Sequence, residues 1–248
     1  MPPIPRDALY QTAKRALDVF LAATGLGVLA IPMAAIAVAI KLDSRGPVFY
    51  RGERVGRYGK AFRIFKFRSM RVHLRGPEAT SANDERITRV GHFIRRYKID
   101  ELPQLFNILR GEMSLVGPRP EVRWCVDLYT EEEKAILDVR PGLTDWSSIK
   151  FHDEGEIIVA SGYSDANQAY LDLIRPEKLR LQLRYVREQS LSQDFKILWK
   201  TFNALLRSRA PIRSSQPPGA GVVAASTDIL VDSEDGLKNK RSLRSVGG

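Results

Sequence analysis

Two adjacent carboxylates, with cations on both sides, are the residues of this sequence best suited to chemistry. Asp100 and Glu101 stand at the head of the stretch Ile99–Pro120, which ends on Arg119 between two prolines. An ionised carboxylate can act as a nucleophile or bind a hard cation. Acids at a helix start are also common as caps or dipole partners without a chemical role. The surrounding cations favour a site for a phosphorylated substrate and a metal over that structural alternative.

A short helix is expected to position the pair. Pro103 suits the first turn of a helix, so the sequence predicts a helix that opens near Leu102, runs to Arg110 and stops at Gly111. Both acids then lie at the positive end of the helix dipole, which favours their ionised forms. Because neighbours in sequence point to different sides of a helix, the two acids can take separate roles.

The motifs around the pair resemble those of a known family. KFRSM (66–70), followed by DERITRVGHFIRRYKIDELPQLFNILRGEMSLVGPRP (84–120), resembles the bacterial sugar transferases called monotopic phosphoglycosyltransferases. The likeness extends from Lys14-Arg15 and Asp18 through GPVFYRGERVG to PGLTDW, and more weakly to about Thr201. Members of that family move a sugar phosphate from a nucleotide sugar to a polyprenyl phosphate. Asp18 is expected to pair with Lys14 or Arg15, or with basic residues after the membrane segment.

The resemblance implies roles for individual residues. Asp100 is expected to attack the β-phosphate of a nucleoside-diphosphate sugar, UDP-linked, and to form a covalent sugar-phosphoryl aspartate. Glu101 is expected to be the second catalytic residue and the ligand of Mg²⁺. The residues expected to bind the substrate phosphates are Lys66, Arg68, Arg86, Arg95 and Arg119. For the first two, the solvated face of a basic strand is the alternative interpretation.

The family pattern is not kept after Thr144. The family often has Trp-x-Gln followed by an Asn-Gly-Arg turn, where this chain has Trp146-Ser147-Ser148 and no such turn. An Asp ahead of a later Tyr is also usual, and Gln182 takes its place here, ahead of Tyr185. In the family, these positions are expected to contact the nucleotide sugar. Because this chain departs from the pattern there, no site residue is assigned in this region.

The uncharged run from Val19 to Ile40 is a candidate membrane segment. As a straight helix it is ~33 Å long, enough to cross the hydrocarbon core of a bilayer. Pro32 lies inside the run and predicts a bend. Both flanks are basic, and the positive-inside tendency would keep both on the cytoplasmic side. We therefore expect a helix that re-enters the same leaflet, as in the resembling family, with a single-span anchor as the alternative.

Local patterns predict several further elements. A hairpin is expected to turn at Tyr58-Gly59-Lys60, a turn at Gly91, and a loop over Leu74–Asn83. Thr130 and Glu133 have the spacing of a capping box at a helix start. Residues 176–206 alternate cationic and apolar positions at helical spacing, which indicates amphipathic helices that lie on anionic lipid. Packing on the catalytic core is the alternative, chiefly for the first half of that segment.

Composition limits the class of protein. The formal charge of +10 and the pI of about 9.8 indicate an anionic partner. A single cysteine, Cys125, excludes an internal disulfide, and no spacing of cysteine and histidine indicates zinc. The cations are not interleaved with aromatic residues as in a protein that stacks bases, which argues against nucleic acid. A catalytically silent membrane scaffold stays open as an alternative, and it predicts that Asp100 is dispensable.

Together these features predict an α/β protein, mainly helical, with a small cytoplasmic catalytic domain. Its parts are an N-terminal re-entrant membrane helix (1–43), a catalytic sugar transferase domain (44–207) and a disordered C-terminal tail (208–248). Expected partners are a nucleotide sugar, polyprenyl phosphate and membrane lipids, and a homo-oligomer stays open. The expected location is the cytoplasmic face of the bacterial inner membrane. The expected reaction is the first membrane step of exopolysaccharide or other glycoconjugate synthesis.

Overall fold

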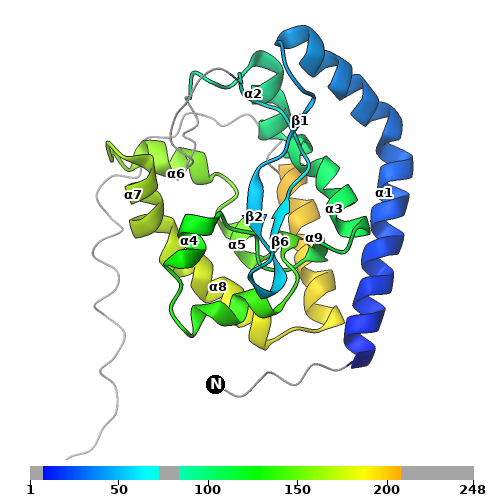
Figure 1. Ribbon diagram of the computed structural model, residues 1–248, viewed down its shortest axis with the longest axis vertical. Helices are drawn as coiled ribbons and strands as arrows, with labels where there is room; N and C mark the ends of the chain where they lie inside the picture. Colours follow the sequence, from blue (N-terminus) through cyan, green and yellow to red (C-terminus); the bar gives the residue numbers. More distant parts are fainter. Residues whose placement is uncertain (1–7, 73–83, 208–248) are drawn as a thin grey trace, which may run out of the picture. The chain divides into compact units, whose positions relative to one another are not determined.

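The structure, a computed structural model, describes residues 8–72 and 84–207 of the 248. The described residues belong to one compact unit, which is mainly helical and contains three short two-stranded ladders (Figure 1). The prediction of a mainly helical chain with one long apolar helix near its N-terminus is confirmed. The predicted loop over Leu74–Asn83 and the predicted tail 208–248 lie outside the described residues.

Helix α1, Ala8–Asp43, runs through Pro32 without a break in its helical assignment. It is the one helix in the described part of the chain that is long and apolar enough to cross a membrane. One side of it is apolar and yet exposed, as at Ile31 and Leu42, whose surfaces are both 83% exposed. Figure 1 shows α1 along one edge of the unit, curving over the neighbouring elements toward its C-terminal end.

The opposite side of α1 is part of the apolar core. Ala22 is fully buried against the segment around Leu105, Ile108 and Met113. Further along the helix, Met33 and Ile40 belong to a second cluster, which also contains Phe67 and Ile94. The helix therefore contributes core residues over much of its length.

Polar side chains near the start of α1 bind it to the backbone of other elements. The Arg15 guanidinium donates to the carbonyl oxygens of Ile108 and Leu109 at 2.7 and 3.1 Å. A carboxylate oxygen of Asp18 accepts the backbone N–H of Leu115 at 2.9 Å. The expectation that Asp18 pairs with a cation is wrong for the described residues, because its carboxylate is used to satisfy a buried backbone donor instead.

The strands are short and pair in three separate ladders. β1 (Phe49–Tyr50) pairs antiparallel with β4 (Lys66–Phe67), β2 (Glu53–Val55) antiparallel with β3 (Ala61–Arg63), and β5 (Ser114–Val116) parallel with β6 (Gly142–Thr144). The predicted hairpin between β2 and β3 is confirmed. Its turn, η1 (Arg57–Gly59), holds Tyr58 and Gly59 at positive φ, 59° and 73°.

Helix α2 (Arg89–Arg96) is followed by the 3₁₀ helix η2 (Ile99–Gln104) and by α3 (Leu105–Leu109). Thr88 caps α2, because its side chain accepts the backbone N–H of Gly91. The prediction of a turn at Gly91 is wrong, since this residue lies inside α2. A side chain there would come within 2.0 Å of the carbonyl oxygen of Ser69, so the glycine allows the helix to approach that backbone closely.

The second half of the described chain is a succession of short helices that leads to two longer ones. These are α4 (Arg123–Asp127), η3 (Glu133–Asp138), α5 (Trp146–Lys150), α6 (Glu154–Ala160), α7 (Ala166–Ala169), the π-helical turn η4 (Tyr170–Ile174), α8 (Arg175–Arg187) and α9 (Leu191–Arg207). The predicted capping box is confirmed. Thr130 and Glu133 each accept the other's backbone N–H through their side chains, at 3.3 and 2.8 Å.

The last two helices differ in what they bury. Leu179 and Val186 of α8 lie in the core, at 2% and 1% exposure, so this helix packs as the structural alternative predicted. Helix α9 buries Ile197 but exposes Phe195 and Trp199, while Phe202 and Leu206 extend the same exposed apolar surface. On its buried side, Asp194 binds the Lys14 ammonium of α1 at 2.8 Å.

Candidate active site

The adjacent acids Asp100 and Glu101 lie in the first turn of η2, the 3₁₀ helix that Pro103 helps to form. The sequence predicted a helix from Leu102 to Arg110. The helical segment instead begins at Ile99, in 3₁₀ geometry, and becomes α-helical only at Leu105. The predicted stop is confirmed, since Gly111 has a φ of +79°. Because η2 is short, cationic side chains rather than a helix dipole provide the positive field at the acids.

Asp100 is almost completely buried, with its side chain 2% exposed. Its Oδ2 forms an ion pair with the Lys66 ammonium at 2.9 Å, whereas its Oδ1 is buried and receives no hydrogen bond from the described residues. A buried carboxylate oxygen without a donor is costly unless a ligand or solvent completes its shell. One oxygen of Asp100 is thus held by a cation, and the other has its lone pairs available for chemistry.

Glu101 is bound by two cations. The Arg119 guanidinium forms a bidentate ion pair with Glu101, with Nη1 donating to Oε2 at 2.9 Å and Nη2 donating to Oε1 at 2.5 Å. The Lys66 ammonium lies 3.4 Å from Oε1. Burial on its own raises the pKa of Glu101, but the charges of Arg119 and Lys66 outweigh it and hold that pKa well below its usual range. The charge of Glu101 in turn raises the pKa of Arg119. Both groups are therefore ionised at neutral pH.

The backbone of Arg119 is fixed by residues far along the chain. Its N–H donates to Asp145 Oδ2 at 3.3 Å, and its carbonyl accepts from the Gln182 side chain at 3.4 Å. Gln182 is fully buried and also donates to Asp145 Oδ2 at 3.2 Å. The sequence analysis did not assign Asp145 or Gln182 to the site, because the family pattern is not kept after Thr144. Their contacts suit a role in orienting Arg119.

A further cation that the sequence did not assign lies beside the pair. Lys98 precedes η2 with a left-handed backbone, φ 54°, and its ammonium donates to the carbonyl of His152 at 2.8 Å. Burial lowers the pKa of Lys98, and the negative charge of Glu101 opposes that shift. A sequence signal was present, since Lys98 stands two residues before Asp100, but its backbone conformation could not be read from the sequence.

The carboxylates also have to be tested as ligands for Mg²⁺. Magnesium in proteins is often bound by one or two carboxylates, with substrate phosphates and water completing its shell. Glu101 Oε2 accepts one hydrogen bond, from Arg119, and Asp100 Oδ1 accepts none from described groups. No group of three or more histidine, cysteine or acidic side chains suited to a metal occurs in the described ranges. The donor set thus fits a cation that a phosphorylated substrate helps to hold.

Comparison with known proteins identifies the family. Residues 9–208 match the sequence profile of the family described as bacterial sugar transferase. The chain belongs to this family. The family predicted from the motifs is thereby confirmed.

Relatives within the bacterial sugar transferase family carry more specific names. The chain is 38% identical to a UDP-N-acetylgalactosamine-undecaprenyl-phosphate N-acetylgalactosaminephosphotransferase of Aeromonas hydrophila, over 80% of this chain and 44% of the relative. It is 42% identical to an undecaprenyl-phosphate glucose phosphotransferase of Komagataeibacter xylinus, over 79% and 36%. It is 38% identical to a UDP-glucose:undecaprenyl-phosphate glucose-1-phosphate transferase of Caulobacter vibrioides, over 82% and 73%. The chain thus spans less than half the length of the first two.

In this family member, three of the predicted phosphate-binding arginines contact other groups. Arg86 forms a two-pronged pair with Asp84, at 2.8 and 2.5 Å. Arg95 reaches Ser69 Oγ at 3.5 Å, and its positive charge also acts on Asp84. Arg68 donates to backbone carbonyls just after α1. The structure therefore brings Lys66 and Arg119 to the acids and places these arginines in other contacts, and their role in binding phosphate stays a prediction.

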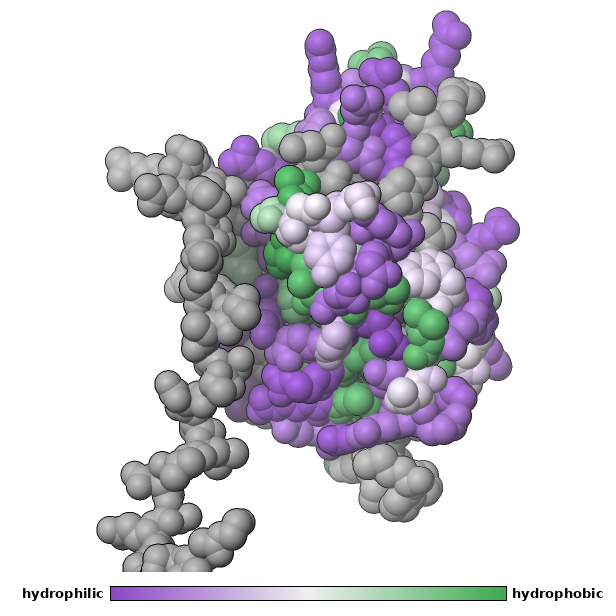
Figure 2. Space-filling view, turned by 90° about the vertical axis from the view of Figure 1, so that its left-hand side faces the viewer, coloured by the Kyte–Doolittle hydropathy of each residue, from purple (hydrophilic) through white to green (hydrophobic). Residues whose placement is uncertain are grey.

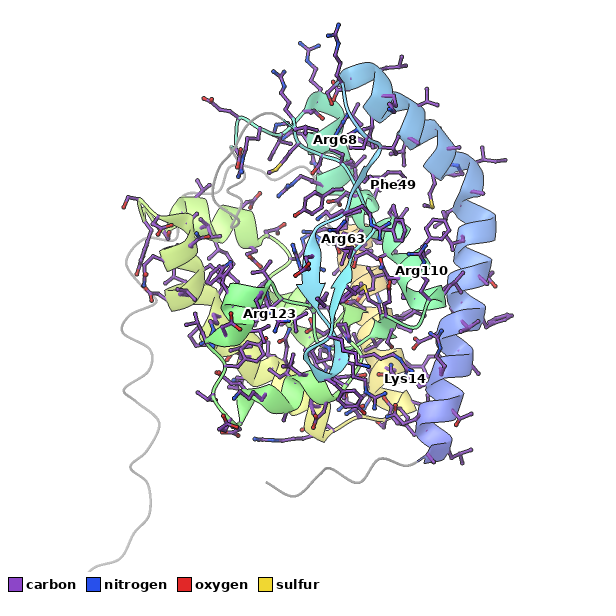
Figure 3. All side chains as sticks on the ribbon, in the orientation of Figure 1. Lys14, Phe49, Arg63, Arg68, Arg110 and Arg123 are labelled. Atoms are coloured by element: carbon purple, nitrogen blue, oxygen red, sulfur yellow. The ribbon has the colours of Figure 1, made fainter. Side chains whose placement is uncertain are left out.

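Arg68 is buried near the C-terminal end of α1 (Figure 3). Its guanidinium donates to the carbonyl oxygens of Ser44 and Arg45 at 2.6 and 3.0 Å and, more weakly, to that of Ile40 at 3.4 Å. Carbonyls at a helix end lack partners within the helix, so Arg68 acts as a cap. These contacts engage both Nη groups of Arg68, while its Nε is buried without a hydrogen-bond partner among the described residues.

Arg68→Met is expected to lower the stability of the fold by about 2 kcal/mol, because buried carbonyls at the end of α1 lose their donors. Thermal unfolding of the purified protein in detergent checks this, with the exposed Arg71→Met as the matched control. The same variant tests the phosphate-binding prediction. If the KM for the donor is unchanged, Arg68 only caps α1 and does not bind phosphate. If the KM rises while the stability stays the same, Arg68 binds phosphate and the capping role is contradicted.

Proposed function

We propose that the chain transfers a sugar phosphate from a UDP-linked sugar to polyprenyl phosphate, and so starts the assembly of an exopolysaccharide or another glycoconjugate. The observation that carries this proposal is the buried Asp100, with Oδ2 on Lys66 and Oδ1 without a donor from the described residues, next to the Glu101–Arg119 pair. Family membership supports it, as do the UDP-sugar and undecaprenyl-phosphate substrates in the names of the relatives given above.

In the proposed first step, Asp100 Oδ1 attacks the β-phosphorus of the donor. The bond from that phosphorus to the oxygen bridging it to the α-phosphate breaks, and the nucleoside monophosphate leaves with the bridging oxygen and its electron pair. The sugar phosphate is then an acyl phosphate on Asp100. Lys66 holds Oδ2, so that Oδ1 faces the donor while the positive charge offsets repulsion between carboxylate and phosphate.

In the second step, an oxygen of polyprenyl phosphate attacks the same phosphorus. The bond to Asp100 breaks, the carboxylate is restored, and the product is a polyprenyl diphosphate sugar. Neither step requires a net proton transfer, which agrees with a site whose two acids are held in ion pairs. Arg119 has the planar fork that can bind two phosphate oxygens, and it is already oriented by Glu101 and by contacts to its backbone.

Glu101 is the proposed ligand of Mg²⁺, together with oxygens of the diphosphate. A magnesium ion there would offset the negative charge that develops on the phosphate oxygens during transfer. The low pKa of Glu101 keeps its carboxylate ionised for this role. Arg119 holds both of its oxygens, so it also fixes the direction in which the carboxylate presents its remaining lone pairs.

The distribution of apolar surface supports a membrane on the α1 side. Helix α1 exposes apolar side chains along its length, and α9 exposes Phe195, Trp199 and Phe202, with cationic residues between them. Aromatic and basic residues on one helix suit a lipid interface. The side of the unit opposite α1 is mostly hydrophilic where Figure 2 displays it. We propose that α1 re-enters the inner membrane from the cytoplasmic face and that α9 lies at the interface.

If α1 re-enters at Pro32, tags at residues 1 and 248 should both be reachable only from the cytoplasm, because both flanks of the apolar run are basic. Cysteine labelling of each tag in intact cells checks this. Pro32→Ala should straighten the helix, since proline in a helix interior costs about 3 kcal/mol, and should expose some N-termini outside. Labelling of the residue-1 tag from outside in the unchanged protein would leave a single-span anchor.

The experiment that tests the proposed function is a screen of UDP-sugars for release of uridine monophosphate by the purified protein. Without polyprenyl phosphate, release should stop near one nucleotide per protein, and adding the acceptor should allow turnover. Omission of Mg²⁺ should abolish both. Absence of release with every UDP-sugar, in the presence of Mg²⁺ and acceptor, would contradict the proposal and favour a silent scaffold.

A further inference from the structure

Lys98 has a backbone conformation that lysine rarely adopts. Its φ of 54° and ψ of 19° lie in the left-handed region, and Tyr58 is the other non-glycine residue at positive φ in the described ranges. Lys98 stands just after α2, at the place where a helix often ends on a left-handed glycine. Non-glycine residues in this region of φ and ψ often occur at functional sites, so the contacts of the Lys98 side chain bear on function.

Lys98 adjoins the two acids in the fold, because it is the N-cap residue of η2 and its carbonyl accepts the backbone N–H of Glu101 at 3.3 Å. Burial lowers the pKa of its ammonium, and the charges of Glu101 and Asp100 oppose that shift. The ammonium donates one hydrogen bond, to the carbonyl of His152 at 2.8 Å. An ammonium has three N–H groups, and no second acceptor for Lys98 lies within hydrogen-bond distance among residues 8–72 and 84–207.

The chemistry of the Lys98 ammonium indicates what its remaining donors can bind. Lys66 and Arg119 pair with the two acids, and Asp145 and Glu154 also act on Arg119, whereas Lys98 forms no ion pair with a described carboxylate within 4 Å. An ammonium with unused N–H donors is suited to an anion with several oxygens. The carbonyl of His152 belongs to the link between α5 and α6, so the ammonium also joins that link to the segment carrying the acids.

We propose that Lys98 binds the β-phosphate of the donor and that its bond to His152 holds the ammonium in place for this task. The inference rests on the proposed function, because it requires a diphosphate at Asp100. A nucleoside monophosphate lacks the phosphate in question. Lys98 therefore contributes to the affinity for a nucleoside diphosphate and to the affinity for the donor, and little to the affinity for the monophosphate product.

Lys98→Gly removes the ammonium while placing at this position the residue that the left-handed backbone favours. The matched control is Tyr58→Gly, which makes the same backbone change at φ 59° in an exposed turn between β2 and β3. Lys98→Arg keeps the charge with a different geometry. The probes are UDP and UMP, titrated calorimetrically into the purified full-length protein in detergent, with the unfolding temperature measured in parallel.

Lys98→Gly should weaken UDP binding about tenfold or more and UMP binding less than about threefold, at an unfolding temperature equal to or above that of the unchanged protein. Lys98→Arg should recover part of the UDP affinity, and Tyr58→Gly should bind both nucleotides normally. Equal losses for UDP and UMP, or a loss together with a lower unfolding temperature, would overturn the proposal in favour of a structural role.

Two further outcomes separate this inference from the function on which it rests. Unchanged UDP affinity in Lys98→Gly, while the unchanged protein binds UDP and releases UMP from a UDP-sugar, would overturn the role of Lys98 alone. Failure of the unchanged protein to bind UDP at all would overturn both proposals together.

Discussion

Asp100→Asn is expected to lower the rate of UMP release by about a thousandfold or more, with the protein still folded and membrane-bound. Asparagine has nearly the same shape as aspartate, but its amide is too weak a nucleophile to form the phosphoryl bond. The fold should tolerate the change, because Lys66 keeps its contact with Glu101 at 3.4 Å. The measurement is UMP release from a UDP-sugar under single-turnover conditions.

The matched control for Asp100→Asn is Asp127→Asn, an identical substitution at an exposed position on α4. Mass spectrometry adds a second readout. A peptide containing Asp100 should gain the mass of one sugar phosphate in the unchanged protein and not in the variant. Retention of more than about a tenth of the activity would show that Asp100 is not the nucleophile.

Arg119→Lys is expected to reduce kcat/KM by about a hundredfold, the size of effect typical when a donor to a developing phosphate charge is lost. Lysine keeps the positive charge but lacks the planar fork that now holds both oxygens of Glu101 and that can bind two phosphate oxygens. A role through charge alone would predict a much smaller effect. Steady-state kinetics with varied donor and Mg²⁺ concentrations provides the measurement.

Arg123→Lys is the control for Arg119→Lys, because Arg123 lies nearby in the sequence and is exposed (Figure 3). Among the described residues, its side chain donates to the backbone carbonyl of Gly59 alone. The unfolding temperature should be recorded for both variants, since Arg119 also neutralises the buried Glu101. Near-normal kinetics for Arg119→Lys would contradict a role for the planar guanidinium and leave Arg119 with an effect through its charge alone.

Local sequence signals predicted those features whose causes are themselves local. The hairpin turn at Tyr58 and Gly59 and the capping box of Thr130 and Glu133 each depend on residues a few positions apart, and both are confirmed. The helix around Pro103 was predicted less well. A proline restricts the first turn of α- and 3₁₀ helices in the same way, so the sequence could not separate the two.

Contacts between distant residues were harder to predict. The motifs predicted Lys66 and Arg119 as phosphate-binding cations of the site around the acids, and both contact Glu101, from 35 and 18 residues away in the sequence. For Arg68, the same reasoning did not reveal that its guanidinium donates to carbonyls at the end of α1. The sequence shows that a residue is basic, but not which acceptors the fold brings to it. The carbonyls that accept from Arg68 come together only once α1 has ended beside β4.

The position of α1 has a consequence for how the protein can be divided. The helix is bound through Arg15 to carbonyls of α3, through Asp18 to β5, and through Ala22 to the apolar cluster beneath the acids. A chain that begins after α1 would expose that cluster and leave those backbone groups without partners. Helix α1 is therefore part of the folded unit, and removing it for expression should yield insoluble or unfolded material.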